Sequence, residues 1–166
     1  PDNTIFKTRA FKFETIAERL RELAFLNPQV VLRIEDGRTK NGEEEVFHFE
    51  GGLREFVQYI DATRPAITKK PFYATGHGED ESGRMVEVEI ALQYNTQFSE
   101  NVFSYVNNIN THEGGTHLVG FRTALTRTIN NYGYKNGLIK ESGVQLVGDD
   151  FREGLTAVLS VKVPEP

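Results

Sequence analysis

The sequence has no cysteine among its 166 residues. A chain without cysteine forms no disulfide, binds no metal through thiolates and has no thiol nucleophile. This composition fits a reducing compartment, so we expect a cytoplasmic protein. The sequence also lacks any apolar run near the roughly 20 residues that a transmembrane helix requires, and we therefore expect no contact with a membrane.

Positive charge is scarce over the chain as a whole but concentrated in one segment. The 24 acidic residues exceed the 19 lysines and arginines, which gives a formal net charge of -5. This balance argues against binding nucleic acid over the whole surface, so any contact with DNA should be local. The segment from Gly114 to Lys140 contains no acid and four basic residues, which are Arg122, Arg127, Lys135 and Lys140. This segment is the best candidate for contact with an anion.

The pattern around this basic segment predicts a strand, a turn and a helix. Residues 102–109 are rich in β-branched and aromatic side chains and predict a strand. Polar residues and two glycines follow over 110–115, and Thr116 is a suitable N-cap. Apolar residues then recur every three or four positions, which predicts an amphipathic helix that ends at Gly133. These apolar residues are Leu118, Phe121, Leu125, Ile129 and Tyr132.

Periodic patterns elsewhere predict both helices and strands, so the expected fold class is α+β. A helix is predicted over residues 13–26, and alternation predicts strands over 30–35 and 46–49 that pair as a hairpin. Residues 53–60 predict a short helix, and 63–65 form the best domain boundary. The remaining predicted elements are a glycine- and acid-rich hairpin loop over 76–83 and strands over 86–94, 144–147 and 155–163.

Two short patterns look like functional motifs but favour structural roles. His112, Glu113 and His117 are similar to a zinc-protease helix, yet the spacing is one residue too long for both imidazoles to bind one metal. Gly114 and Gly115 before a helix fit a phosphate-binding turn, but the lysine and spacing of a P-loop are missing. A tight turn and a helix cap are the favoured interpretation, and we predict no metal site.

Three longer segments resemble one protein family in the same order. They are FHFEGGLREFVQYI at 47–60, NNINTHEGGTHLVGFRTALTRTINNY at 107–132 and DDFREGLTAVLSVKVPEP at 149–166. They resemble the ATPase subunits of bacterial type II topoisomerases, most closely the B subunit of DNA gyrase. The form LVGFRTALTR favours gyrase over topoisomerase IV. The similarity covers nearly the whole chain. The sequence begins without a start methionine, and Pro1 and Asp2 look like the last two residues of a strand in this family, so we expect this chain to be a piece of a larger protein.

The resemblance implies a fold and a division of the chain. Residues 1–64 would be the end of a GHKL-type ATPase lobe, with a helix, a hairpin and a helix packed together. Residues 65–166 would be the transducer domain, which is similar to the second domain of ribosomal protein S5. This domain would have a mostly four-stranded sheet with helices on one face. In the family a lysine on a loop after the final strand contacts ATP, and this chain would stop before that loop.

The resemblance also implies a function. The parent would couple ATP binding and hydrolysis to DNA strand passage and negative supercoiling, and this segment would relay nucleotide state to the DNA gate. The N-terminal lobe of the family holds ATP and magnesium, and its motifs are not in this sequence. The chain alone should therefore bind no cofactor, contain no catalytic residue, and be inactive and monomeric. The implied partners of the parent are DNA, the A subunit of gyrase and a second copy of the B subunit.

Arg122 and Arg127 are the candidate residues for contact with DNA. In the family this helix lines a cavity through which a DNA segment passes, and Arg122 occupies the matching arginine position. Arg127 is the second candidate. From the residues alone, Arg122 could instead pair with an acid on a neighbouring strand, such as Glu87 or Glu89.

Three other functions stay open at this point. The first is the same role in the B subunit of topoisomerase IV. The second is a non-enzymatic, S5-like module that binds nucleic acid, although an RNA-binding module should carry a basic net charge and this chain is acidic. The third is a hydrolase that uses His112 and His117, which should bind zinc.

Overall fold

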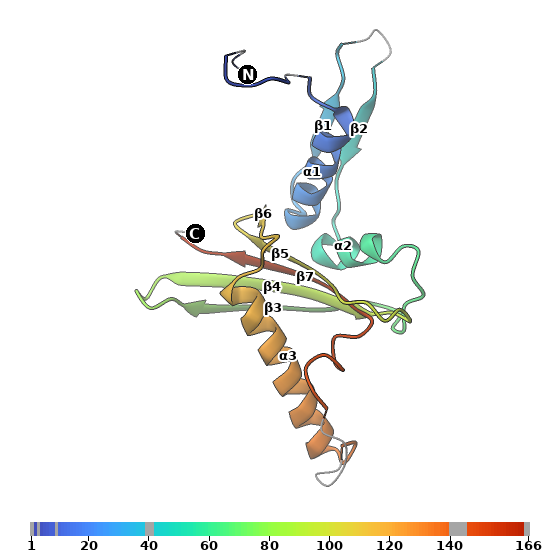
Figure 1. The fold of residues 1–166 in the computed structure, drawn as a ribbon, viewed down its shortest axis with the longest axis vertical. Coiled ribbons are helices and arrows are strands. Elements are labelled where there is room, and N and C mark those ends of the chain that lie inside the picture. Colours follow the sequence, from blue (N-terminus) through green and yellow to red (C-terminus); the bar gives the residue numbers. More distant parts are fainter. Residues whose placement is uncertain (1, 3, 9, 39–41, 140–145, 165–166) are drawn as a thin grey trace.

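The computed structural model describes residues 2, 4–8, 10–38, 42–139 and 146–164. A five-stranded sheet lies at the centre, with a helix and a two-stranded hairpin extending on one side and a long helix on the other (Figure 1). Within the described ranges, no helix combines the length and apolar character that crossing a bilayer requires. The elements are α1 (Phe13–Leu26), β1 (Leu32–Glu35), β2 (Glu44–Phe47), α2 (Gly52–Ile60), β3 (Phe72–Glu79), β4 (Met85–Tyr94), β5 (Asn101–Val106), β6 (Ile109–Asn110), α3 (Thr116–Lys135) and β7 (Leu155–Lys162).

Helix α1 forms over the predicted residues because its apolar side chains repeat at helical spacing. One set of these side chains packs on the β1–β2 hairpin, and two at the end of the helix reach the core of the central sheet. The hairpin-facing residues are Phe13, Ala17 and Ala24, and the sheet-facing residues are Phe25 and Leu26. Helix α1 therefore contributes to two clusters of the core.

The strands of the hairpin are shifted from their predicted positions. Strand β1 begins at Leu32, later than predicted, because the backbone N–H of Val30 is used in the turn after α1. Strand β2 spans Glu44–Phe47 and so begins earlier than predicted. Phe49 therefore lies beyond β2, where its ring stacks on that of Phe25 with ring centroids 3.7 Å apart.

The strands of the central sheet are ordered β3-β4-β7-β5-β6. Strands β5 and β7 are parallel, and the other neighbours are antiparallel. The four long strands correspond to the expected sheet, and the two-residue β6 adds a fifth. Parallel neighbours need a crossover connection, which α3 supplies between β5 and β7.

Helices cover both faces of this sheet. Helix α3 packs on one face against alternate residues of β4, which include Val86 and Val88. On the other face, Phe56 of α2 packs in a cluster with Ala91 and Tyr105 of the sheet. The sequence predicts helices on only one face for residues 65–166, and α3 is the one that lies there. The other face is covered by α2, from the N-terminal part of the chain, so the two parts share one core.

A buried carboxylate also joins the end of α2 to the sheet. Asp61 is 4% exposed, and it accepts a hydrogen bond from Thr156 Oγ1 at 2.7 Å. Asn95 Nδ2 donates to both carboxylate oxygens at 3.2 Å, and Arg64 Nη1 lies 3.2 Å from Oδ1. Because Asn95 follows β4 and Thr156 lies in β7, Asp61 links α2 to two neighbouring strands.

Two predicted elements have different boundaries in the structure. The predicted loop over 76–83 is partly strand, because β3 continues to Glu79 and Asp80 then accepts hydrogen bonds from two backbone N–H groups of a short turn. The predicted strand over 102–109 is a hairpin, because β5 ends at Val106 and the next two residues have positive φ. These are Asn107 at 48° and Asn108 at 65°, as a tight two-residue hairpin turn requires.

Helix α3 is longer than predicted, and both predicted ends are wrong. Thr116 is the first helical residue rather than the N-cap, and no side chain among the described residues caps the helix. Gly133 is buried inside the helix, where a Cβ would lie 2.5 Å from Cδ1 of Ile139. The left-handed residue is Gly137, with φ of 66°, just after the helix. Half of the predicted strand over 144–147 lies outside the described residues, and the described residues 146 and 147 form no strand.

Candidate nucleic-acid interface

The start of α3 is fixed to β5 by polar contacts. Thr111 Oγ1 lies 2.6 Å from Ser104 Oγ and 3.0 Å from Nε2 of His117. Burial lowers the pKa of His117, so its imidazole is neutral at pH 7. Gly115 has φ of 155°, and a Cβ there would lie 2.8 Å from the His117 ring. The glycines therefore make the predicted tight turn, which brings the chain close to the first turn of α3.

The zinc-like pattern at the start of α3 has no metal-binding geometry. His112 and Glu113 are exposed in the turn, whereas the ring of His117 contacts Thr111. Within the ranges that the structure describes, no three side chains of metal-ligating type come close enough to hold an ion. His112 lies in the turn and His117 lies in α3, so the backbone holds the two imidazoles apart.

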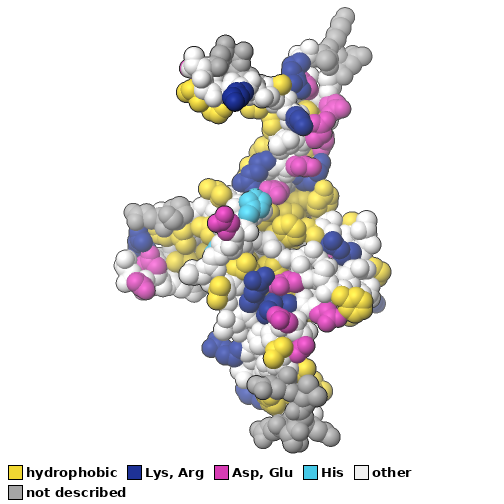
Figure 2. All heavy atoms as spheres, in the orientation of Figure 1, with side chains coloured by type: hydrophobic (Ala, Val, Ile, Leu, Met, Phe, Trp, Pro, Cys, Tyr) yellow, Lys and Arg dark blue, Asp and Glu magenta, His cyan; other side chains and the backbone are white. Residues whose placement is uncertain are grey.

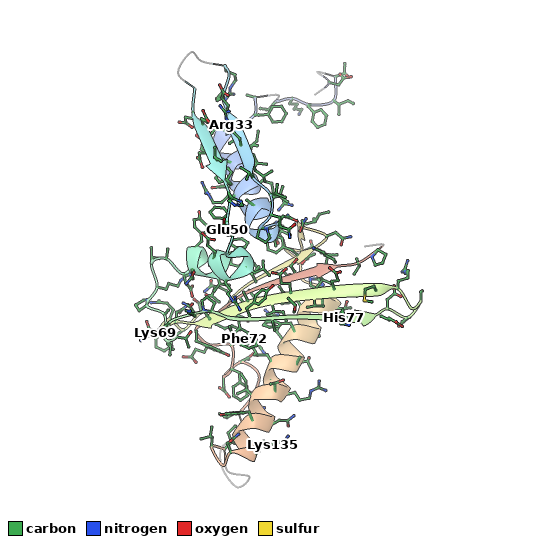
Figure 3. The ribbon with its side chains drawn as sticks, turned by 180° about the vertical axis from the view of Figure 1, so that it is seen from behind. Arg33, Glu50, Lys69, Phe72, His77 and Lys135 are labelled. Carbon is green, nitrogen blue, oxygen red and sulfur yellow. The ribbon has the colours of Figure 1, made fainter. Side chains whose placement is uncertain are left out.

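The predicted apolar stripe of α3 packs on the sheet only in its first half. Phe121 is buried, and Leu118 and Leu125 pack against the same cluster. Tyr132, further along the stripe, is 62% exposed. The helix runs away from the sheet, and Figure 3 shows Lys135 at its distant end. The basic side chains nearest the sheet are therefore those of the first half of the helix.

Arg122 pairs with Glu100, the residue that precedes β5. Arg122 Nε donates to Glu100 Oε1 at 2.9 Å, and the Arg122 side chain remains 39% exposed. The other carboxylate oxygen lies 3.5 Å from Nε of Arg152, which also pairs with Asp149. Among the described residues, the two Nη groups of Arg122 have no hydrogen-bond partner. Glu100 thus lies between two guanidinium groups.

The acids suggested by the sequence as partners of Arg122 are the wrong ones. In β4 the valines that alternate with Glu87 and Glu89 pack against the α3 side of the sheet. Successive side chains of a strand point to opposite faces, so both glutamates lie on the face away from α3. Glu89 accepts a hydrogen bond there from the Tyr73 hydroxyl at 3.0 Å. Arg122 does pair with an acid, but that acid is Glu100.

Three arginines surround a shallow hollow beside α3. In Figure 2, dark blue and magenta side chains lie together just below the sheet in this region. Arg127 is exposed and lines the same hollow as Arg122, although residues five apart on a helix point about 140° apart. Two of these arginines pair with acids, Arg122 with Glu100 and Arg152 with Glu100 and Asp149. The hollow has a volume of about 470 Å³ and is lined by Val119, Arg122, Thr123, Thr126, Arg127 and Arg152.

Sequence reasoning missed Arg152 and Glu100. Arg152 lies in the turn before β7, and its side chain is only 18% exposed. Gly148 makes room for it, since a Cβ there would lie 2.6 Å from Nη1 of Arg152. No periodic pattern links either residue to Arg122. The only available signal was the DDFREG segment, which belongs to the family resemblance and contains Arg152.

Comparison with known proteins identifies the family. A profile of the DNA gyrase B family matches residues 52–166, which is more than half of the chain. The chain belongs to the DNA gyrase B family. The B subunit of DNA gyrase from Cytophaga aurantiaca is 54% identical over 170 residues, which cover 100% of this chain and 34% of that protein. The B subunit of DNA topoisomerase 4 from Enterococcus faecalis is 48% identical over 165 residues, which cover 99% of this chain and 23% of that protein.

Solved structures agree with this family and with the predicted fold. The 43K ATPase domain of Thermus thermophilus gyrase B, in complex with an aminocoumarin, matches with a TM-score of 0.83 and 40% identity. The match covers 100% of this chain and 43% of that one. The B-subunit of the Myxococcus xanthus gyrase matches with a TM-score of 0.74 and 25% identity, over 99% of this chain and 43% of that one. The chain therefore spans about a third or less of the two curated relatives above and has the α+β fold of gyrase B ATPase domains.

Proposed function

We propose that the protein containing this chain is the ATPase subunit of a DNA gyrase. It couples ATP binding and hydrolysis to DNA strand passage and introduces negative supercoils. Its partners are DNA, the gyrase A protein and a second copy of itself, its cofactors are ATP and magnesium, and its location is the cytoplasm. The family match and the identity of the relatives support this proposal. The segment alone lacks the ATP-binding motifs and is inactive.

Within that protein, this segment transmits nucleotide state mechanically. Residues 1–64 belong to the ATPase lobe and residues 65–166 to the transducer domain. The observation that carries this role is the buried contact between the two parts, in which Asp61 receives hydrogen bonds from Asn95 and Thr156. If α2 moved away from the sheet, these hydrogen bonds would break and the shared core around Phe56 would be exposed to water. The connection is therefore stiff enough to relay a displacement.

The hollow beside α3 is the part of the segment that contacts DNA. Arg122 and Arg127 bind the phosphates of the passing segment, and Arg152 adds a third cation beside them. Phosphate contacts of this kind position DNA without reading its sequence. Because the overall charge is negative, the contact is local and weakens as salt rises.

The test uses the full-length protein together with the gyrase A protein on relaxed plasmid DNA. The unmodified protein should introduce negative supercoils when ATP is present. Arg122→Gln should lower the rate of supercoiling about ten-fold, because the loss of one charge-assisted hydrogen bond costs about 1.4 kcal/mol. The matched control is Arg33→Gln, an arginine that also pairs with carboxylates but lies on the distant hairpin, as Figure 3 shows. The control should supercoil normally. An Arg122→Gln protein with unchanged supercoiling would refute the role of the hollow.

A second candidate function is the same role in topoisomerase IV. The 48% identity with the topoisomerase 4 subunit from Enterococcus faecalis supports this alternative. The same assay separates the two. A protein of topoisomerase IV should unlink catenated DNA and relax supercoils without introducing negative ones.

A further inference from the structure

Glu100 is shared by two arginines that come from different segments. Arg122 belongs to α3, Arg152 to the turn before β7, and Glu100 itself precedes β5. Each arginine contacts a different carboxylate oxygen through its Nε, at 2.9 Å for Arg122 and 3.5 Å for Arg152. The Glu100 side chain is 26% exposed, so it is partly shielded from water. The carboxylate therefore ties three segments together at the edge of the hollow.

The contact through Nε leaves the end of Arg122 available. A guanidinium recognises phosphate with its forked N–H groups, and the Nη groups of Arg122 have no partner among the described residues. Anchoring the Nε restricts the rotation of this long side chain, whose freedom would otherwise be lost on binding. Arg127, which lines the same hollow, has no such anchor within the described part of the chain.

We propose that Glu100 is a positioning residue that holds Arg122 ready for phosphates of the passing DNA. This inference rests on the proposed function, since it takes DNA as the anion. A carboxylate at this place has a second effect, because its charge repels phosphate. The two effects have opposite signs when the charge is removed. Loss of positioning lowers productive contact with DNA, whereas loss of repulsion raises it.

The test again uses the full-length protein with the gyrase A protein, and the measured quantity is the number of supercoils introduced per ATP hydrolysed. Glu100→Gln removes the charge and keeps the size of the side chain. Supercoils per ATP should fall about two- to five-fold, the range for a partly exposed ion pair. The KM for ATP and the ATPase rate without DNA should not change. The Glu100→Gln/Arg122→Gln double variant should equal Arg122→Gln alone, because Glu100 acts through Arg122.

Glu153→Gln is the matched control. It makes the same change in charge one residue from Arg152, and Glu153 is exposed without a side-chain contact among the described residues. Its supercoils per ATP should match the unmodified protein. An unchanged or raised value for Glu100→Gln would overturn the positioning role, and so would an equal fall in the control or additive losses in the double variant. A fall in the ATPase rate without DNA would mean that the change damages the fold, which also overturns it.

The unmodified protein separates this inference from the proposed function. Failure of that protein to supercoil DNA, or to raise its ATPase rate when DNA is added, would refute the proposed function and the role of Glu100 with it. Normal activity of the unmodified protein, together with normal coupling in Glu100→Gln, would refute the role of Glu100 alone.

Discussion

Replacing Asp61 with alanine should destabilise the chain strongly. The Asp61 side chain is 2% exposed and accepts hydrogen bonds from Thr156 and Asn95, which are themselves buried. Alanine would remove the acceptor of the Thr156 hydroxyl and would leave Asn95 Nδ2 with only Thr156 Oγ1, at 3.2 Å. Each buried O–H or N–H that loses its acceptor costs about 1–3 kcal/mol. Arg64 is 29% exposed and can turn to water, so its contribution is smaller. We expect the free energy of unfolding to fall by about 3–5 kcal/mol.

Thermal unfolding followed by circular dichroism would measure this loss. For a chain of this length, each 1 kcal/mol lowers the Tm by about 2–4 °C, so Asp61→Ala should lower it by roughly 6–20 °C. Asp149→Ala is the control, because that side chain is 87% exposed and an exposed ion pair contributes about 0–1 kcal/mol. If Asp61→Ala changed the Tm no more than the control, the buried bonds of Asp61 would not stabilise the contact between α2 and the sheet.

Two further predictions concern α3 and its first turn. Gly120→Ala should raise the free energy of unfolding by about 0.5–1 kcal/mol, because a Cβ there meets no described atom within 4 Å. Gly133→Ala should lower it despite the same gain in helix propensity, because its Cβ would lie 2.5 Å from Ile139, and urea titration of both variants would show opposite shifts. Burial places the pKa of His117 below its unfolded value of 6.5, so the stability that this residue contributes is present above pH 6.5 and lost as the pH falls. His117→Gln should therefore lose less stability than the unmodified chain between pH 7.5 and pH 5.5, and an equal loss would contradict this reasoning.

Elements with strong local periodicity could be predicted from the sequence. Helix α1 has the predicted bounds, and β4 alternates as expected, since Val86 and Val88 face the core on the α3 side. The family and its fold could be predicted from three long segments. These features depend on residues close together in the chain, where the period of the side chains decides which face is buried.

The turn between β5 and β6 could not be predicted, because distant residues stabilise it. Asn107 exchanges two hydrogen bonds of 2.9 Å with the backbone of Val163, which is 56 residues away. The carbonyl oxygen of Asn108 accepts a hydrogen bond of 2.5 Å from Arg19 of α1, which is 89 residues away. Without these contacts to Val163 and Arg19, the β-branched and aromatic residues on both sides of the two asparagines look like one continuous strand.

The candidate interface was predictable only in part, for the same reason. Arg122 and Arg127 lie on one helix and share a basic segment, so the sequence contains a local signal for both. Glu100 and Arg152 come from different segments, and the sheet order brings them to the hollow. A charge pattern along the chain cannot show that an acid 22 residues earlier offsets an arginine.

Strand β7 contains a signal for the second helical layer. Residues 155–161 are all buried, and they include no alternation between apolar and exposed side chains. Such a continuous buried run needs cover on both faces, and α3 can cover only one. A helix from another part of the chain must therefore pack on the opposite face, and α2 does so. Thr156 then lies within this covered run as a polar side chain without access to water. Burial of its hydroxyl requires a hydrogen-bond partner from the covering layer, and Asp61 at the end of α2 is that partner.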